Sequence, residues 1–231
     1  MNDSLGAVGR DVIGCRRCPR LVEHRERVAR EKKRAFQEEP YWGKPVPGLG
    51  DPHARLLLVG LAPAAHGANR TGRMFTGDVP GGAADFLAAA LHRAGFANQP
   101  TSRHADDGLA LRDAYVTAIA RCAPPQNKPT SAEIANCAYY LDREFALLTD
   151  LRVILALGGT AFDQCLRLLK RFGASVPRPK PRFGHGAVVD LHGAPTLVGA
   201  YHPSRQNTQT GRLTPEMFDE VFDTVNRHLT A

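Results

Sequence analysis

The sequence has no uncharged apolar run of about 18 residues, the length that a membrane-spanning helix needs. Its start, MNDSLGAVGRDVIGC, does not combine a charged region with a long apolar stretch. We therefore expect no signal peptide, no membrane contact and a cytoplasmic protein. Cysteine is scarce, with five residues in 231. A disulfide framework is not expected in a cytosolic chain of this kind.

Several common catalytic motifs are also missing. The sequence has no Walker phosphate loop, no Gly-x-Ser-x-Gly elbow and no His-Glu-x-x-His pair. The glycines of GLAPAAHG have the wrong spacing for a dinucleotide-binding fingerprint. The best-known signatures of nucleotide hydrolases, α/β-hydrolases and zinc proteases are therefore absent.

The composition is that of an ordinary globular protein, with 43% hydrophobic and 23% charged residues. It excludes a collagen, a coiled-coil rod and an extended disordered chain. The length suits one large domain, and no repeat or linker interrupts it. We expect residues 1–231 to form a single domain.

The charge is unbalanced, with 30 Lys and Arg against 23 Asp and Glu and a net charge of +7. Between residues 10 and 34 there are ten Arg or Lys and only four Asp or Glu. This excess is consistent with a polyanionic partner such as nucleic acid. A solvated helix face is the alternative explanation.

Short apolar segments alternate with helical segments along the chain. We expect strands at 55–59, 115–120, 153–157, 187–191 and 196–199, and helices at 21–36, 83–94, 130–148, 161–172 and 216–229. This order predicts an α/β fold, a three-layer α/β/α sandwich with a central, mostly parallel four-stranded sheet. Three long loops follow strands, at the edge where such sheets bind ligands.

Two of these loops carry a resemblance to a known family. GLAPAAHGANRTGRMFTGD (60–78) and AYHPSRQNTQTGRLTPEM (200–217) resemble the two signature motifs of the uracil-DNA glycosylase superfamily. The CRRC pair near the N-terminus, with two later cysteines, is similar to the iron–sulfur enzymes of prokaryotes. GLAPAAHG resembles family 5, or type b, which lacks the motif 1 acid of family 4.

The resemblance implies a monofunctional DNA glycosylase that begins base-excision repair. Such an enzyme hydrolyses the N-glycosidic bond of uracil and other deaminated bases, including hypoxanthine, in double- or single-stranded DNA. We expect it to act as a monomer. Two alternatives stay open: a non-catalytic damaged-DNA-binding protein, and a zinc-stabilised nucleic-acid-binding module.

A glycosylase must flip a base out of the helix and grip it. Phe75 is the candidate platform on which the base stacks. The resemblance places Gly60, Ala62 and His66 of motif 1 beside it in the binding site. His202, in the His-Pro-Ser of the second motif, is implied as the donor that stabilises the departing base anion.

The residue that activates water is less obvious, because motif 1 has Leu61 and Ala62 where relatives carry an acid. Asp78 is the nearest acid, although it could instead cap the helix expected at 83–94. Family 4 enzymes carry a segment of the form YVTNxxKCxPP. The similar segment of this chain is YVTAIARCAPP, with Ala118 in place of the Asn. Asn127 is the remaining amide nearby, and an Asx turn is its alternative role.

The absence of this Asn also predicts a broad substrate range. Ala118 offers no polar group to reject a mismatched base, and Ala64 and Ala65 keep the first motif small. In the third loop, Ser204, Arg205 and Gln206 are candidates for contacts with the DNA strand, or else belong to a solvated loop.

Four of the cysteines form one candidate metal site, listed here as Cys15, Cys18, Cys122 and Cys137. Four thiolates suit either zinc or a [4Fe–4S] cluster on chemistry alone. The resemblance implies the [4Fe–4S] cluster. Cys165 lies among leucines of an expected helix and is interpreted as a small buried residue.

Overall fold

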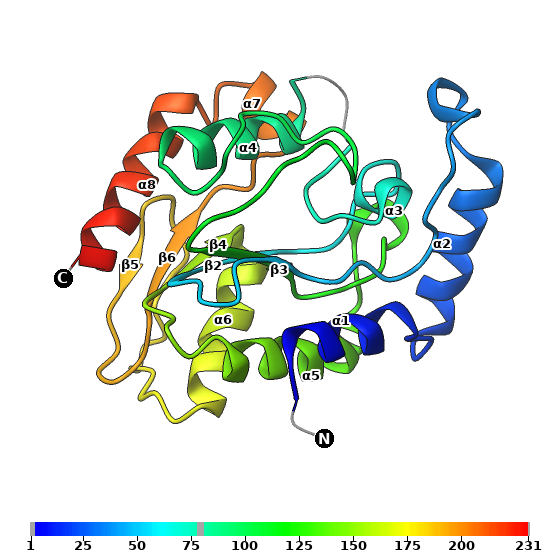
Figure 1. The fold of residues 1–231 in the computed structure, drawn as a ribbon. Helices are drawn as coiled ribbons and strands as arrows, with labels where there is room; N and C mark the ends of the chain where they lie inside the picture. Colours follow the sequence, from blue (N-terminus) through cyan, green and yellow to red (C-terminus); the bar gives the residue numbers. More distant parts are fainter. Residues whose placement is uncertain (1–2, 78–80, 231) are drawn as a thin grey trace.

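The computed structural model describes residues 3–77 and 81–230, which are arranged around one twisted sheet (Figure 1). In these residues the sheet has six strands in the order β1-β3-β2-β4-β6-β5. The strands are β1 (Leu49–Gly50), β2 (Leu56–Gly60), β3 (Ala114–Ala118), β4 (Val153–Leu157), β5 (Val188–Val189) and β6 (Thr196–Ala200). The four central strands run parallel, and the two edge strands pair antiparallel with their neighbours.

The expected four-stranded sheet is therefore corrected to six strands. Its parallel centre is as predicted, and the strand expected at 187–191 is present as the shorter β5, which pairs antiparallel at the edge. β1 was not expected, because its two residues are too few to produce the period-two hydrophobic pattern that identifies a strand.

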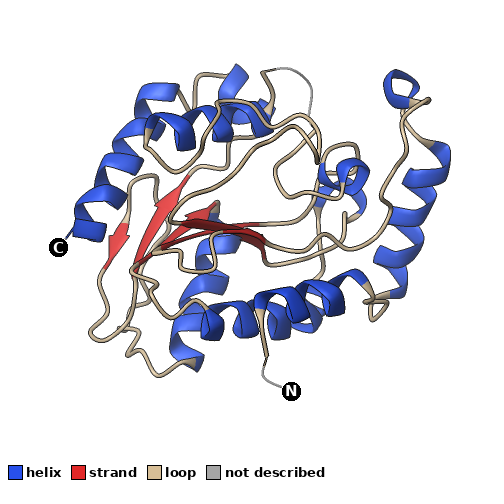
Figure 2. Ribbon diagram, in the orientation of Figure 1, coloured by secondary structure: helices blue, strands red, loops and turns tan. Residues whose placement is uncertain are grey.

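Helices cover both faces of the sheet, as predicted for a three-layer sandwich (Figure 2). They are α1 (Leu5–Ile13), α2 (Pro19–Glu31), α3 (Ala68–Thr71), α4 (Ala83–Arg93), α5 (Ser131–Leu147), α6 (Gly159–Arg171), α7 (Arg205–Gln209) and α8 (Pro215–Thr230), with 3-10 turns η1 (Arg34–Phe36) and η2 (Pro125–Asn127). No helix of the described ranges is long and apolar enough to cross a membrane.

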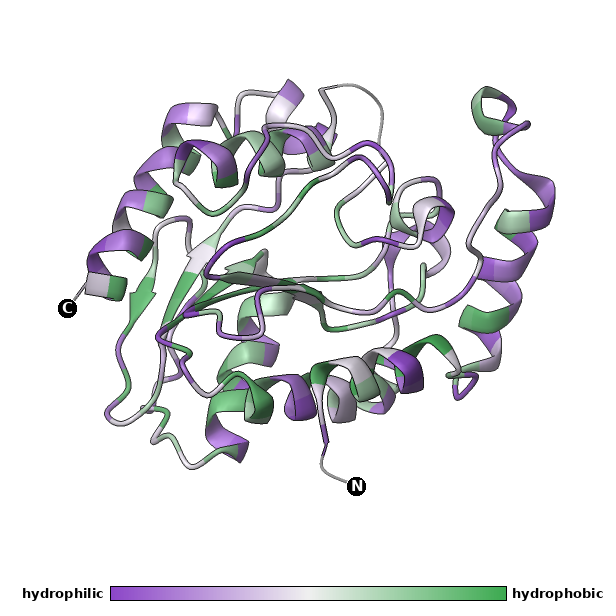
Figure 3. Ribbon diagram, in the orientation of Figure 1, coloured by the Kyte–Doolittle hydropathy of each residue, from purple (hydrophilic) through white to green (hydrophobic). Residues whose placement is uncertain are grey.

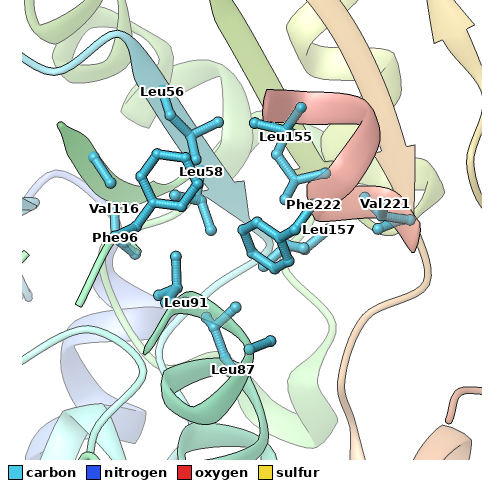
Figure 4. Packing of buried hydrophobic residues seen from close by; sticks show 14 of the residues in the cluster. Leu56, Leu58, Leu87, Leu91, Phe96, Val116, Leu155, Leu157, Val221 and Phe222 are labelled. Atoms are coloured by element: carbon cyan, nitrogen blue, oxygen red, sulfur yellow. The ribbon is translucent and has the colours of Figure 1, made fainter. Parts of the chain in front are cut away.

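The alternation of side chains along β2 produces two cores, one on each side of the sheet. Leu56 and Leu58 face the core that is closed by α4 and α8, which Figure 4 shows from close by. Leu57 and Val59 face the core that is closed by α5 and α6. All of β2 is buried, as a strand covered on both faces must be.

The helix expected at 21–36 is shorter and in two parts. It ends at Glu31, because Lys32 adopts a left-handed φ of 52°, and η1 follows. Figure 3 shows α2 as mostly hydrophilic, in contrast to the hydrophobic central strands. The capping box of α5 is confirmed, with Thr130 and Glu133 bonding each other's backbone N–H.

A buried ion pair joins the end of β3 to α5. The Arg121 guanidinium binds the Glu144 carboxylate, and both side chains are only 1% exposed. Thr117 and Tyr115 of β3 donate hydroxyl hydrogen bonds to the same carboxylate. Because this network fixes the chain just before Cys122, it also fixes one member of the candidate metal site.

Candidate active site and cysteine cluster

A small, mostly apolar cavity of about 60 Å³ lies where the loops after β2 and β6 meet. These strands are parallel, so both loops leave the sheet at the same edge. The described residues that line the cavity are Ala62, Pro63, Ala64, Gly67, Ala68, Met74, Phe75, Thr76, Ala83, Ala84 and His202. The two signature loops are therefore brought together, and Ala62, Phe75 and His202 share one site.

Phe75 has an unusual backbone and a close neighbour. Its φ is 47°, which an aromatic residue rarely adopts. The ring packs directly on Gly60, where an added Cβ would lie 2.6 Å from the Phe75 Cζ. The rings of Phe75 and His202 are 6.0 Å apart and 31° from parallel. Gly60 therefore acts through its lack of a side chain, which leaves room for the Phe75 ring.

The turn that carries Phe75 is held by a distant loop. The Arg73 guanidinium donates to the Asp107 carboxylate at 2.7 Å and to the Thr76 hydroxyl at 2.8 Å. The Thr76 hydroxyl also bonds the Ser102 hydroxyl at 2.8 Å. Sequence reasoning missed Ser102 and Asp107, because they lie in a polar loop about thirty residues away with no motif of their own.

The Asp107 carboxylate is strongly stabilised in its ionised form. Partial burial opposes ionisation, but backbone N–H groups, first that of Leu109, and the Arg73 guanidinium outweigh it and lower the pKa to about 2. Hydrogen bonds to an ionised carboxylate lower its pKa in this way. The Phe75 turn is thus held by a charge that persists well into the acid range.

His202 lies just beyond β6, and hydrogen bonds to its carbonyl oxygen hold its backbone in place. Its carbonyl accepts the Ser204 N–H at 2.7 Å and the Asn207 side-chain amide at 2.8 Å. Gly158, at the end of β4, lies close by, so that a Cβ there would be 3.8 Å from the His202 Cβ. These contacts direct the half-buried imidazole toward the cavity that it lines.

His66 is not among the described residues that line the cavity. Its Nδ1 lies 2.9 Å from the Tyr41 hydroxyl, which accepts the Lys33 backbone N–H at 3.3 Å. Burial lowers the pKa of His66, and the nearby charges of Lys33 and Arg70 lower it further. The imidazole is therefore neutral near pH 7, and it joins motif 1 to the segment after α2.

Two candidate catalytic residues have no described place in the cavity. Asp78 lies outside the described residues. Asn127 ends η2 with a φ of 56°, is exposed, and is not among the described lining residues. Its backbone N–H donates to the Pro124 carbonyl at 3.2 Å, within the turn.

The candidate DNA contacts lie at the start of α7. Ser204 is the N-cap of this helix, and its hydroxyl accepts the Asn207 N–H at 3.4 Å. Arg205 and Gln206 follow in the first turn and are exposed. Capping therefore accounts for Ser204, while the next two side chains are presented to solvent beside the site.

The four candidate cysteines come from three places in the fold. Cys15 and Cys18 flank the turn between α1 and α2, Cys122 follows β3, and Cys137 lies in α5. Cys18 and Cys122 pack in one small cluster with Leu21, and Cys15 packs with Tyr140, one turn from Cys137 in α5. The four cysteines therefore lie in one region of the fold. Cys165 is fully buried in the leucine-rich core, as the sequence analysis predicted.

Polar side chains donate to two of the four sulfur atoms. The Arg25 guanidinium donates to the Cys122 sulfur at 3.3 Å, and the Asn136 amide donates to the Cys18 sulfur at 3.4 Å. Burial raises the pKa of the Cys122 thiol to about 12, although Arg25 acts in the opposite direction. Such donors would favour a thiolate, the form that binds metal.

No group of three or more His, Cys, Asp or Glu among residues 3–77 and 81–230 is arranged to hold a single metal ion. Four cysteines, as a donor set, suit zinc or an iron–sulfur cluster on chemistry alone.

Three larger hollows, of about 660, 690 and 590 Å³, lie elsewhere. The first is formed by the N-terminal parts of α5 and α6 with the segment 180–183, the second lies at the opposite edge of the sheet, and the third lies between α2 and the segment 42–44. None of the three is lined by a described residue of the two signature loops. The small cavity at Phe75 is therefore the candidate active site.

The chain matches known proteins over most of its length. The family model of the uracil DNA glycosylase superfamily matches residues 47–226. The type-5 uracil-DNA glycosylase of Mycobacterium tuberculosis (strain CDC 1551 / Oshkosh) is 56% identical over 209 residues, covering 90% of this chain and 75% of that protein. That of Mycobacterium leprae is 54% identical (95% and 93% covered), and that of Thermus thermophilus 53% (91% and 92%).

Proposed function

Because the chain belongs to the uracil-DNA glycosylase superfamily, and within it to the type-5 enzymes that hydrolyse N-glycosyl bonds, we propose that it releases hypoxanthine as well as uracil from DNA. Other deaminated bases are included in this range. The enzyme is a DNA-repair hydrolase, and its products are the free base and an abasic site. It acts as a monomer within one domain.

The observation that carries this proposal is the apolar character of the cavity. Apart from His202, the polar side chain that lines it in the described ranges is Thr76, whose hydroxyl is already bonded to Ser102 and to the Met74 carbonyl. Ala118, which pairs with Gly60 in the sheet beside the cavity-lining loop, is 1% exposed and has no polar group to offer. A site with few fixed polar contacts has little means of rejecting a base of the wrong pattern.

In the proposed mechanism the flipped base stacks on Phe75, and the small residue Ala62 leaves room beside it. Base–aromatic stacking is worth about 1–3 kcal/mol. His202 lies near the base edge and donates to the oxygen on which negative charge develops as the N-glycosidic bond breaks. Asp78 orients the attacking water and balances the positive charge on the sugar carbon. No Lys lies in either motif, so water completes the reaction without a covalent intermediate.

The remaining candidate residues have supporting roles. His66, fixed by Tyr41, presents a neutral imidazole at the side of motif 1 that faces α2. Ser204 caps α7 and so places Arg205 and Gln206 against the DNA strand. Asn127 approaches the base or the attacking water only in the DNA complex, because its exposed turn lies outside the described cavity.

The cysteine cluster holds a [4Fe–4S] centre in this proposal, with Cys15, Cys18, Cys122 and Cys137 as ligands. Hydrolysis needs no redox step, and the centre, when bound, links the turn between α1 and α2 to β3 and α5. Replacing Cys15 with Ser should abolish the visible absorption and lower the soluble yield. Cys165→Ser should change neither, and a fully active, iron-free zinc protein would contradict this part.

The substrate range is tested by single-turnover cleavage of matched duplexes that carry uracil opposite guanine or hypoxanthine opposite thymine. Release of both bases is expected at enzyme excess. Uracil release without any hypoxanthine release would refute the broad range. In Ala118→Asn the ratio of hypoxanthine to uracil cleavage should fall, because the amide restores a polar contact; an unchanged ratio would show that Ala118 is not the cause.

A further inference from the structure

Two buried arginines lie beside the cysteine cluster, and they differ in how their charge is balanced. Arg121 makes a bidentate ion pair with Glu144, a carboxylate that is equally buried. Arg25, in the middle of α2, is 2% exposed and has no such partner among the described residues. This difference requires an explanation, because a buried charge is normally paired.

The hydrogen bonds of Arg25 show which groups its guanidinium contacts. One guanidinium nitrogen donates to the Cys122 sulfur and another to the Cys15 carbonyl, each at 3.3 Å. Its Nε is buried and has no hydrogen-bond partner in residues 3–77 and 81–230. The guanidinium therefore touches two members of the candidate metal site from different parts of the chain.

The nearby carboxylate does not account for Arg25. Glu26 lies 3.8 Å from the Arg25 guanidinium, but it bonds Arg16 at 2.5 Å and is partly exposed. A partly solvated acid that is already paired gives weak compensation to a buried cation. The counter-charge must come mainly from the sulfur side.

We propose that Arg25 is a positioning residue for the iron–sulfur centre, which it holds by donating to the Cys122 thiolate and by balancing the negative charge of the thiolate-bound cluster. This inference rests on the proposed [4Fe–4S] cofactor. Four thiolates make such a centre an anion overall, and hydrogen bonds to its sulfurs tune it. Asn136, which donates to the Cys18 sulfur, is neutral.

The position of Arg25 also explains why a charge is tolerated inside α2. The guanidinium spans from the start of the α1–α2 turn to the loop after β3, so one side chain fixes two ligand segments relative to each other. Partners outside the ligand shell commonly change metal affinity by about 10–100-fold when they are removed. Loss of Arg25 should therefore weaken retention of the centre rather than abolish folding.

The test compares Arg25→Met and Arg25→Lys with Arg27→Met, a control on the exposed face of the same helix. Iron and acid-labile sulfide per chain are measured, followed by the rate of cluster loss to a chelator. Arg25→Met should lose its cluster about ten- to a hundredfold faster than the control. Arg25→Lys keeps the charge but cannot bridge Cys122 and Cys15 in the same way, so its rate should be intermediate.

The reduction potential separates the role of charge from that of packing. Arg25→Met should lower the potential, because removing a nearby positive charge disfavours the added electron, and Arg25→Lys should restore it. Equal loss rates in Arg25→Met and Arg27→Met would overturn the inference. If Arg25→Met is insoluble, a wild-type loss rate in Arg25→Lys would overturn it instead.

The cofactor proposal fails differently. A wild-type protein purified without oxygen that contains neither iron nor sulfide would refute the cluster itself. A wild-type protein with a full cluster and an insensitive Arg25 would refute only the role of Arg25.

Discussion

Phe75 combines a left-handed backbone with a side chain that closes the candidate site. A non-glycine residue in this conformation costs about 1–2 kcal/mol, which the surrounding contacts must offset. Those contacts are the hydrogen bonds from the Arg73 guanidinium to Asp107 and Thr76. Arg73 and Thr76 lie on either side of Phe75 in the sequence. The turn therefore fixes where the ring lies, and Gly60 supplies the surface on which it rests.

Gly60→Ala tests this arrangement. The new Cβ would lie 2.6 Å from the Phe75 Cζ, so the ring must move away from its platform position. Single-turnover uracil release should slow by about tenfold or more, in line with the loss of a stacking contact. The double variant Gly60→Ala/Phe75→Ala should be no slower than Phe75→Ala alone. An added loss in the double variant would show that Gly60 acts by another route.

His202→Ala and Asp78→Asn test the proposed chemistry. Groups that stabilise developing charge or move a proton each contribute about 10²–10⁴ in rate. Each variant should slow single-turnover cleavage by roughly two orders of magnitude while DNA binding is retained. If Asp78→Asn cleaves at the wild-type rate, Asp78 is a helix cap and another group orients the water.

At the residue level the motifs predicted the positions of some candidate residues and not of others. Phe75, Ala62 and His202 share one cavity because two parallel strands deliver their loops to the same edge. His66 instead bonds Tyr41, and Asn127 lies on an exposed turn. Neither position could be inferred from a motif, because each depends on segments that only the fold brings together.

Among the elements, those with a strong local pattern were predicted well. β4 matches its expected range of 153–157, and α5 begins at the predicted capping box. The short elements α1, α3 and β1 were not predicted. Packing against the rest of the molecule stabilises them: α1, for example, packs on α5 through Val8 and Tyr140. The four residues of α3 and the two of β1 are too few to carry a periodicity from which such packing could be inferred.

The loop 98–111 acts as a support for the Phe75 turn, and its stability should depend on pH through Asp107. The pKa of this carboxyl is lowered from 3.8 to about 2 in the folded protein. A lowered folded-state pKa stabilises the protein above the unfolded value, and this contribution is lost as the pH falls toward about 2.

Asp107→Asn should therefore reduce the free energy of unfolding by about 2 kcal/mol at neutral pH. Near pH 3 the difference from the wild type should shrink to about half, because part of the wild-type advantage is then titrated. Urea unfolding at both pH values measures this difference in the free energy of unfolding. Asp106→Asn, at the neighbouring position, serves as the control. A difference that stays constant with pH would assign the effect to packing instead of charge.

Across the whole molecule, the residues around the sheet and the residues around the cysteines form separate groups. The two large cores hold the sheet, α4, α5, α6 and α8, and none of the four candidate ligands. Val8, Val12 and Tyr140 pack with Cys15 in one satellite cluster, and Leu21 packs with Cys18 and Cys122 in another. The segment containing α1 and α2 thus depends on small clusters and on the proposed metal centre.

Removal of the iron should therefore loosen one part of the chain before the rest. Segments with few buried apolar contacts open first, and α2 buries only Leu21, Val22 and Arg25 along its described length. Hydrogen bonds from Trp42 and Gly43 to the α3 backbone remain and should limit the opened region to the residues before them.

Limited trypsin digestion of the iron-depleted protein should cut first within residues 16–34, where Arg and Lys are dense. Mass spectrometry locates the cuts, and the iron-loaded protein, digested in parallel, should resist at the same sites. Cuts spread evenly through the sheet of the depleted protein would show that the cysteine region and the cores unfold as one unit.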